Sequence, residues 1–539
     1  MNTFEIKSFT GLSDYEDKGI TGSFKFGTNL DVRKRVDSLS SLQAMVDEGL
    51  NSSSSPSASV SPSSSTSPSS SPSATASPSS SASPSSSVSS SPSPSTGTSD
   101  SPSSSESASA SPSASTSPSS STSPSPSPSS GLSTVFDDLI LFFVEANDGY
   151  TYGFGNTGSV YRRDSDGFWA RVYKDPDGGI VGASEWYSST DTYLFFATGT
   201  LIKKKPLPGL DDWNDVETVG NLTQSDWHTM TQAGGALTIC NKELIAYVGY
   251  DQSFTPEATD LIPGNISKTI VERDGRAVIG TVKASQPTRG VNGAIDTEVP
   301  LAQVGSDGEI FFADMLDSQP VTKFPGGGKV NPGGVTNTIK SVDFFLWEEG
   351  ASSWIDKQSV GNLALFGVYG ADSGKNGVYS YGRKAKNKPF VLNLDYEMDV
   401  DEIGAVININ GTVLASYQDG TDFGVKATSS TTKATATYEG LDFKSPLEKP
   451  TMITNWKMTE LYFDPLPDGA SLEFWYRVNK DGDFVQAYTT DGTATHSIAD
   501  TQKAVFLLGV DGDIFEPKVV LNPVGNSSPE VHRIRTFFE

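Results

Sequence analysis

Hydrophobic and polar residues alternate in short runs along most of the chain. Residues 139–144 form an apolar stretch of strand length, which the turn Asn147-Asp148-Gly149 follows. Three more runs, at 150–154, 159–163 and 168–173, are separated by turns rich in Asn, Asp and Gly. Such turns favour tight hairpins between antiparallel strands. The pattern predicts a meander of four strands.

Similar strand-rich units recur at intervals of roughly 40 residues, a spacing that is typical of propeller blades. We count seven units, at 139–173, 179–219, 227–251, 269–282, 300–328, 362–398 and 402–427, although the edges of the fourth to sixth are loose. The rhythm predicts a roughly seven-bladed β-propeller. A pair of large β-sandwiches or an irregular β-helix remains an alternative, because no strict motif repeats from unit to unit.

The last hundred residues have a different rhythm, with at least five alternating strands. This density favours a compact β-sandwich. Alternation places Phe474 and Tyr476 on one face of a strand, and Glu473 and Trp475 on the other. Helix signals are weak throughout. Residues 39–46 have helical spacing but are equally compatible with a strand.

Residues 51–130 have a very different composition, with 47 serines and 14 prolines. Only Asp100 and Glu106 are charged there. With almost nothing apolar to offset the entropy of the chain, this tract is expected to be disordered or partly polyproline II. Residues 1–50 are too few to bury a core alone, so the tract is expected to be an insertion into one fold.

The sequence therefore predicts an all-β protein with four segments. Residues 1–50 supply strands to the propeller, and 51–130 form the disordered Ser/Pro-rich insertion. The propeller continues over 131–439, and a C-terminal β-sandwich occupies 440–539.

Charge and composition exclude several classes of protein. The net charge is −26, whereas binding to nucleic acid or to an anionic membrane needs a basic surface. No stretch is long and apolar enough for a spanning helix, and the first residues do not read as a secretory signal. Cys240 is the only cysteine and there are three histidines, so we expect neither a disulfide nor a metal or other cofactor.

Motifs for catalysis are weak. Asp226-Trp227-His228 could polarise a histidine, but a merely hydrogen-bonded strand residue is the simpler interpretation. The loop 324–329 is rich in glycine and ends in a lysine, but it lacks the spacing of a phosphate loop. Asp175-x-Asp177 and Asp511-Gly-Asp513 could supply calcium ligands, but neither continues into a full ligand loop. Hairpin turns are therefore the preferred interpretation of both.

Aromatic side chains are the remaining candidates for contact with a ligand. Exposed rings offer flat apolar faces to sugars, although aromatic residues are also the ones that cores bury. The candidates for contact with a glycan or a protein partner are Trp186, Tyr187, Trp347, Trp354 and Trp475.

Long stretches resemble a family of structural proteins of tailed bacteriophages. The resemblance begins at GLSDYEDKGITGSFKFGTNLDVRKRVDSLSSLQAM and resumes after the tract at DLILFFVEANDGYTYGFGNTGSVYRR. It continues through DWHTMTQAGGALTICN and AIDTEVPLAQVGSDGEIFFADM to EPKVVLNPVGNSSPEVHRIRTFF, and so covers nearly all of the chain except the tract. It implies a virion component built as a β-propeller with a C-terminal sandwich, and no catalytic residues.

We therefore expect a non-enzymatic component of a phage virion, in the tail or the head–tail region. It would be assembled in the bacterial cytoplasm, in several copies and against other virion proteins. The alternative is a tail module that binds a receptor or a host-surface glycan. A glycan depolymerase is a further alternative, for which the abundant acidic residues give no specific signal.

Overall fold

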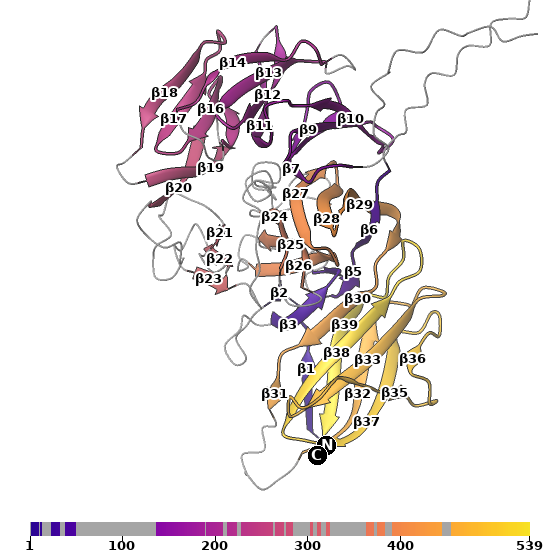
Figure 1. The fold of residues 1–539 in the computed structure, drawn as a ribbon. Helices are drawn as coiled ribbons and strands as arrows, with labels where there is room; N and C mark the ends of the chain where they lie inside the picture. The colour runs from indigo at the N-terminus through magenta and orange to yellow at the C-terminus, as the bar shows by residue number, and fades with distance from the viewer. Residues whose placement is uncertain are drawn as a thin grey trace, which may run out of the picture. The chain divides into compact units, whose positions relative to one another are not determined.

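The computed structural model describes most of the chain outside the Ser/Pro tract. The described residues are 2–9, 11–12, 23–32, 38–49, 136–188, 190–208, 213–223, 228–261, 265–273, 276–283, 302–304, 310–313, 320–323, 363–370, 375–382, 391–444 and 454–539. The predicted tract at 51–130 lies outside them. The described residues form strands and turns, with no helix among them (Figure 1). The prediction of an all-β protein is confirmed.

Three consecutive four-stranded meanders follow the tract. The first contains β7 (Ile140–Glu145), β8 (Thr151–Gly155), β9 (Ser159–Arg163) and β10 (Trp169–Lys174). The second contains β11 (Ile180–Tyr187), β12 (Thr192–Thr198), β13 (Leu201–Pro206) and β14 (Glu217–Asn221). The third contains β15 (Met230–Ala233), β16 (Ala236–Asn241), β17 (Leu244–Val248) and β18 (Phe254–Asp260).

The predicted turn Asn147-Asp148-Gly149 joins β7 to β8. Gly149 has φ of 87°, a left-handed conformation that glycine adopts without the steric cost of a side chain. The Asp148 carboxylate accepts a hydrogen bond from the backbone N–H of Tyr150 at 3.1 Å. The turn therefore forms for the reason that the sequence suggested.

Smaller sheets follow the three meanders. They are the pair β19 (Asn265–Arg273) and β20 (Arg276–Lys283), and the triplet β21 (Ala302–Val304), β22 (Ile310–Ala313) and β23 (Pro320–Lys323). A further triplet is β24 (Leu363–Val368), β25 (Gly377–Gly382) and β26 (Val391–Glu397). The last set, β27 (Glu402–Ile409), β28 (Thr412–Asp419) and β29 (Asp422–Lys433), has β6 (Gln43–Asp47) as its fourth strand.

Apolar side chains on both faces of these strands pack the sheets against one another. In β12, Leu194 and Phe196 join a core with the first meander, whereas Phe195 and Ala197 join a core with the third. Alternation along a strand sends neighbouring residues to opposite faces, so a continuous apolar run serves two interfaces. The first strands of successive sets lie against each other, from β24 through β27, β7, β11 and β15 to β19.

Strand β6 and Phe136, which lie on either side of the tract in the sequence, both pair with one edge of β29. Asp47 pairs with Lys426, and the backbone N–H of Glu48 donates to the Val425 carbonyl at 2.8 Å. In this register residue 50 would stand opposite Phe423, and Phe136 takes that position instead. The chain therefore leaves the edge of β29 after Gly49 and re-enters it one register step further on, after the tract. The indigo β6 is seen beside the orange β29 in Figure 1.

Glu48 fixes this junction to the first meander. Its carboxylate forms an ion pair with Arg163 and accepts a hydrogen bond from the indole of Trp169 at 2.8 Å. The backbone N–H of Trp169 also donates to the carbonyl of Gly49 at 3.1 Å. Within residues 39–46, for which the pattern allowed helix or strand, Ser40 and Ser41 pair with Leu30–Asp31, and the residues from Gln43 onward are extended as the edge partner of β29.

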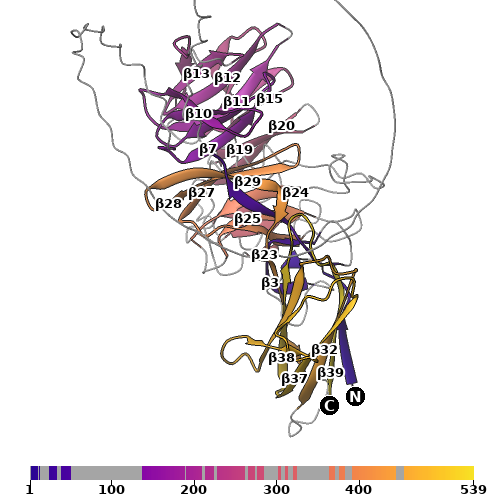
Figure 2. The same cartoon turned by 90° about the vertical axis from the view of Figure 1, so that its right-hand side faces the viewer.

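The C-terminal strands form two sheets around a shared core. One contains β1 (Asn2–Ile6), β39 (Val531–Phe538), β32 (Asn455–Phe463), β37 (Lys503–Asp511) and β35 (Tyr488–Thr489), in that order. Figure 2 shows the indigo β1 beside β39. The second continues from β26 through β2 (Gly11–Leu12), β3 (Ser23–Thr28), β30 (Ala436–Gly440), β38 (Ile514–Asn522) and β33 (Ser471–Val478) to β34 (Val485–Gln486).

Four short strands complete the description. Strand β31 (Phe443–Lys444) pairs with β38, and β36 (Thr495–His496) pairs with β33. Strand β4 (Leu30–Asp31) pairs with β5 (Ser40–Ser41).

The core between the two C-terminal sheets is strongly aromatic. Trp456 stacks on Phe515 with ring centroids 4.8 Å apart, and Phe4 of the first strand stacks on Phe443 at 3.8 Å. The first strand of the chain therefore contributes to a core that also contains residues of β3, β24 to β26 and β30, together with residues of the last hundred positions.

Candidate functional site

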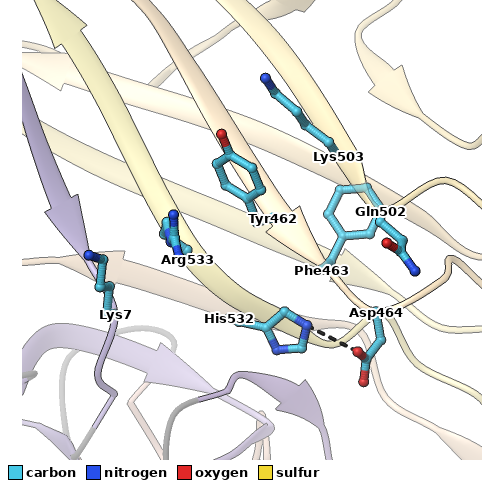
Figure 3. Close-up of a pocket in the computed structure, with 8 residues that line it drawn as sticks. All are labelled: Lys7, Tyr462, Phe463, Asp464, Gln502, Lys503, His532 and Arg533. Atoms are coloured by element: carbon cyan, nitrogen blue, oxygen red, sulfur yellow. Dashed lines mark ion pairs between the residues drawn. The ribbon is translucent and has the colours of Figure 1, made fainter.

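A cavity of about 580 Å³ lies on the C-terminal sheet that begins with β1, and we call it the sheet pocket. Its lining residues, drawn in Figure 3, are Lys7, Tyr462, Phe463, Asp464, Gln502, Lys503, His532 and Arg533. They come from the end of β32, from the starts of β37 and β39, and from the residue that follows β1.

The register of three strands places Tyr462 between two cations. Tyr462 of β32 pairs with Lys503 of β37 on one side and with Arg533 of β39 on the other. The Lys503 ammonium lies 5.4 Å and the Arg533 guanidinium 5.1 Å from the centre of the Tyr462 ring. Leu461 and Phe463 are buried, so alternation turns Tyr462 toward the outer face.

The Glu460 carboxylate fixes the positions of Tyr462 and Lys503. Its carboxylate accepts from the Tyr462 hydroxyl at 2.6 Å and pairs with the Lys503 ammonium at 2.5 Å. Burial raises the pKa of Glu460, but the hydrogen bonds from Lys503 and Tyr462 outweigh it and lower the pKa overall. The same pairing raises the pKa of Lys503. Both groups are therefore held in their charged forms at neutral pH.

The other charges of the sheet pocket differ in how they are paired. His532 Nε2 lies 3.1 Å from Asp464 Oδ1, and Lys7 pairs with Glu5. Within the described part of the chain, no carboxylate lies at ion-pairing distance from Arg533. Glu5, which pairs with Lys7 and Arg535, acts on the Arg533 charge only from beyond ion-pairing distance, so no direct ion pair has to break before the guanidinium on Tyr462 contacts a ligand.

Trp186 is not a surface platform, contrary to the expectation from the sequence. It is fully buried in the core between the second and third meanders, because a neighbouring sheet covers each face of β11. The adjacent Tyr187 points the other way and is 53% exposed. Its backbone is held by Gln232, whose amide donates to the Tyr187 carbonyl at 2.7 Å.

The other predicted aromatic contacts are Trp475, Trp347 and Trp354. Trp475 is half-buried on β33, and its indole N–H donates to the Glu473 carboxylate at 2.9 Å. Trp347 and Trp354 lie outside the described residues. Of the predicted residues that the structure describes, Trp186, Tyr187 and Trp475, none lines the sheet pocket.

His228 is buried, and its Nδ1 lies 2.8 Å from the backbone carbonyl of Cys240. This contact fits the simpler interpretation, a hydrogen-bonded residue within a sheet. Asp226 and Trp227, the other members of that motif, lie outside the described residues, as does the glycine-rich loop at 324–329.

The carboxylates of Asp175 and Asp177 face a lysine. The buried ammonium of Lys203 donates to Asp175 at 2.7 Å and to Asp177 at 2.6 Å. Burial lowers the pKa of Lys203, but both aspartates outweigh it and raise the pKa overall. At the other predicted pair, Asp511 accepts from the Asn455 amide at 2.5 Å, and the backbone N–H of Asp513 donates to the Asn479 side chain at 2.8 Å.

A pair of buried carboxylates lies where β31 meets β38. Glu516 pairs with Arg477 and with Lys25, and Asp442 pairs with Lys480. Burial raises the pKa of Glu516, but Arg477, Asp442 and Lys25 lower it to about 2. Burial and the proximity of Glu516 raise the pKa of Asp442. With three cations around two carboxylates, the cluster ties β3 and β33 to β38 by charge as well as by backbone pairing.

A metal-binding cluster and a membrane-spanning helix are not found among the described residues. No group of three or more His, Cys, Asp and Glu side chains is placed to hold a metal ion there. No helix in that part of the chain has the length and apolar character to cross a membrane.

Sequence reasoning missed the sheet pocket. Lys7, Tyr462, Lys503 and Arg533 are far apart in the chain and belong to no recognisable motif. The one available signal was alternation within 459–463, which turns Tyr462 away from the core. Strand order and register, which bring the cations to this tyrosine, emerge only from the fold.

Among known proteins, this chain is similar only to solved structures, and the similarity is distant. No protein-family model and no curated protein matches the chain. The WD40 β-propeller domain of Doa1 matches with a TM-score of 0.32 and 14% identity, over 56% of this chain and 96% of that one. The Cps50 (Swd1) β-propeller domain from Myceliophteria thermophila matches with a TM-score of 0.33 and 11% identity, over 54% and 96%.

A third match is the extracellular domain of the one component system BT4673 from B. thetaiotaomicron. Its TM-score is 0.33 at 12% identity, over 65% of this chain and 43% of that one. Because these scores and identities are low, we take the fold from the strand pairing itself. Consecutive four-stranded antiparallel meanders, packed face to face through their apolar sides, define a β-propeller-like protein.

Proposed function

We propose that this protein is a non-enzymatic structural component of a tailed-phage virion, in the tail or the head–tail region. The proposal combines the resemblance of its sequence to phage structural proteins with one observation about the fold. Strands from the first 49 residues pair with strands nearly 400 or more residues away. These pairs are β1 with β39, β2 with β26 and β6 with β29.

Such long-range pairing suits a building block of a particle. It ties distant parts of the chain to each other through backbone hydrogen bonds, which lowers the chance that a sheet opens locally. Local opening exposes backbone to proteases and to wrong pairing with neighbouring chains. A component that must survive outside a cell benefits from this restraint.

The finer architecture that we propose is a seven-bladed β-propeller followed by a β-sandwich. Seven successive antiparallel sets among the described strands, from β7 to β29, support the number of blades. Contacts between the first strands of six of these sets, from β24 through β27, β7, β11 and β15 to β19, support a radial arrangement. The two C-terminal sheets that share the core around Trp456 support the sandwich.

Gradient-purified particles of the virus that encodes this chain provide the test. We expect quantitative mass spectrometry to find the protein in several copies per particle, and antibodies against residues 454–539 to label the tail or the neck in electron micrographs. The absence of the protein from particles, with abundant protein in the lysate, would refute the structural role.

A second candidate function, binding of a receptor or glycan, is favoured by the sheet pocket. Three cations line this cavity, and two of them, Lys503 and Arg533, lie over the ordered ring of Tyr462. The two functions are compatible, since a tail component can also bind. A depolymerase would release new reducing ends from a host polysaccharide, and that assay separates cleavage from binding.

A further inference from the structure

We propose that the sheet pocket binds an acidic saccharide, whose carboxylate pairs with Arg533. This inference deepens the second candidate function, binding of a glycan, and rests on it. It is independent of the role in the virion.

The lining of the sheet pocket is richer in cations than this acidic protein as a whole. The chain carries a net charge of −26, whereas Lys7, Lys503 and Arg533 line the cavity with one carboxylate, that of Asp464; Glu5 and Glu460 pair with the two lysines, which leaves Arg533 as the cation without a direct ion pair among the described residues. A local positive site in a negative surface attracts an anionic ligand at short range, and the surrounding acidic surface disfavours extended polyanions. This combination favours a ligand with isolated negative charges over nucleic acid.

Arg533 is the best placed of the three cations to bind the ligand. Lys503 is tied to Glu460 and Lys7 to Glu5, whereas no carboxylate of the described residues lies at ion-pairing distance from Arg533, on which Glu5 acts only from farther away. The Tyr462 ring holds the guanidinium at 5.1 Å, and the hydroxyl of that tyrosine is itself fixed by Glu460. A guanidinium that is ordered before binding loses less entropy when it forms the paired hydrogen bonds that a carboxylate accepts.

The remaining lining groups suit hydroxyl groups. The Gln502 amide both donates and accepts, the Asp464 carboxylate accepts, and both come from the same end of the cavity as His532 (Figure 3). A volume of about 580 Å³ is within the range of small-ligand sites and admits one or two sugar rings. A carboxylate together with several hydroxyls is the chemistry of a uronic-acid type of sugar.

Isothermal titration calorimetry or NMR titration of the full chain with tri-galacturonic acid tests the proposal. Maltotriose is the neutral probe of similar size, and inorganic phosphate reports a simple oxyanion site. We expect tri-galacturonic acid to bind, its affinity to fall as salt rises, and maltotriose not to bind. Arg533→Gln should weaken binding by roughly 10-fold or more, as expected when a charge-assisted pair is lost.

Arg162→Gln is the matched control, because Arg162 also lies over a tyrosine, 4.7 Å from the Tyr150 ring, but far from the sheet pocket in the strand order. It should bind tri-galacturonic acid like the wild type. Unfolding midpoints of both variants show whether the fold is intact.

Three results would overturn the proposal. They are equal binding of maltotriose and tri-galacturonic acid, unchanged binding by Arg533→Gln, and binding of inorganic phosphate without binding of tri-galacturonic acid. None of them bears on the presence of the protein in virus particles, so failure here is distinguishable from failure of the structural role.

Discussion

Removal of residues 51–130 is expected to leave the fold intact and to stabilise it slightly. The register along β29 puts Gly49 and Phe136 at neighbouring positions of one edge, so the fold itself needs almost no chain between them. The deletion joins Leu50 to Gly131 and leaves both β6 and the Phe136 bridge unchanged.

The size of the effect follows from the entropy of closing a loop. The deletion shortens the connection between Gly49 and Phe136 from about 86 residues to about six, which is roughly a 14-fold change. At (3/2)RT ln n, the free energy of unfolding should rise by about 2 kcal/mol. The dependence of unfolding on denaturant should stay the same, because a tract of serine and proline adds almost no buried surface.

Urea unfolding, followed by tryptophan fluorescence, measures both quantities. A second variant that carries a scrambled tract of the same length and composition is the control and should match the wild type. A loss of more than about 2 kcal/mol on deletion, or a clearly smaller denaturant dependence, would refute the reasoning, because it would mean that the tract packs against the fold.

Three further predictions concern single side chains. Glu48→Gln should lower the free energy of unfolding by about 1–3 kcal/mol in urea titrations, because the Arg163 guanidinium and the Trp169 indole both lose their carboxylate partner. Glu145→Gln, at an exposed position, is the control and should leave the free energy of unfolding unchanged. Lys203→Met should cost about 3–5 kcal/mol, because Asp175 is left charged and buried, and adding Asp175→Asn should recover part of the loss in thermal unfolding. His496 is buried, which lowers its pKa below 6.5, so protonation disfavours the fold. Stability should therefore fall as pH drops below about 6.5, by at most ~1.4 kcal/mol per unit from this group, and His496→Gln should reduce that slope.

The parts of the fold that neighbouring residues form, such as hairpins and meanders, could be predicted from the sequence. The meander of β7 to β10 follows from an apolar run and from turns whose glycines adopt the left-handed conformation, as Gly149 does. Both signals are encoded by neighbouring residues, so they can be recognised without knowing what packs where.

Strand pairing and packing between residues far apart in the chain could not be predicted. The partner of β6 lies nearly 400 residues further along the chain, and nothing in residues 43–47 specifies β29. Burial of Trp186 has the same origin, because its exposure is decided by the meander that packs on it. The sheet pocket depends on register in two strand pairs at once, since a shift of one residue would turn Tyr462 into the core.

The structural role is tested most directly by a cryo-EM reconstruction of purified particles of the virus that encodes this chain. We predict repeated density in the tail or the neck into which the described β-sheets fit, with β6 completing the edge of β29. A reconstruction in which other proteins account for all tail and neck density, with this protein confined to the unassembled fraction of the lysate, would contradict the proposed function.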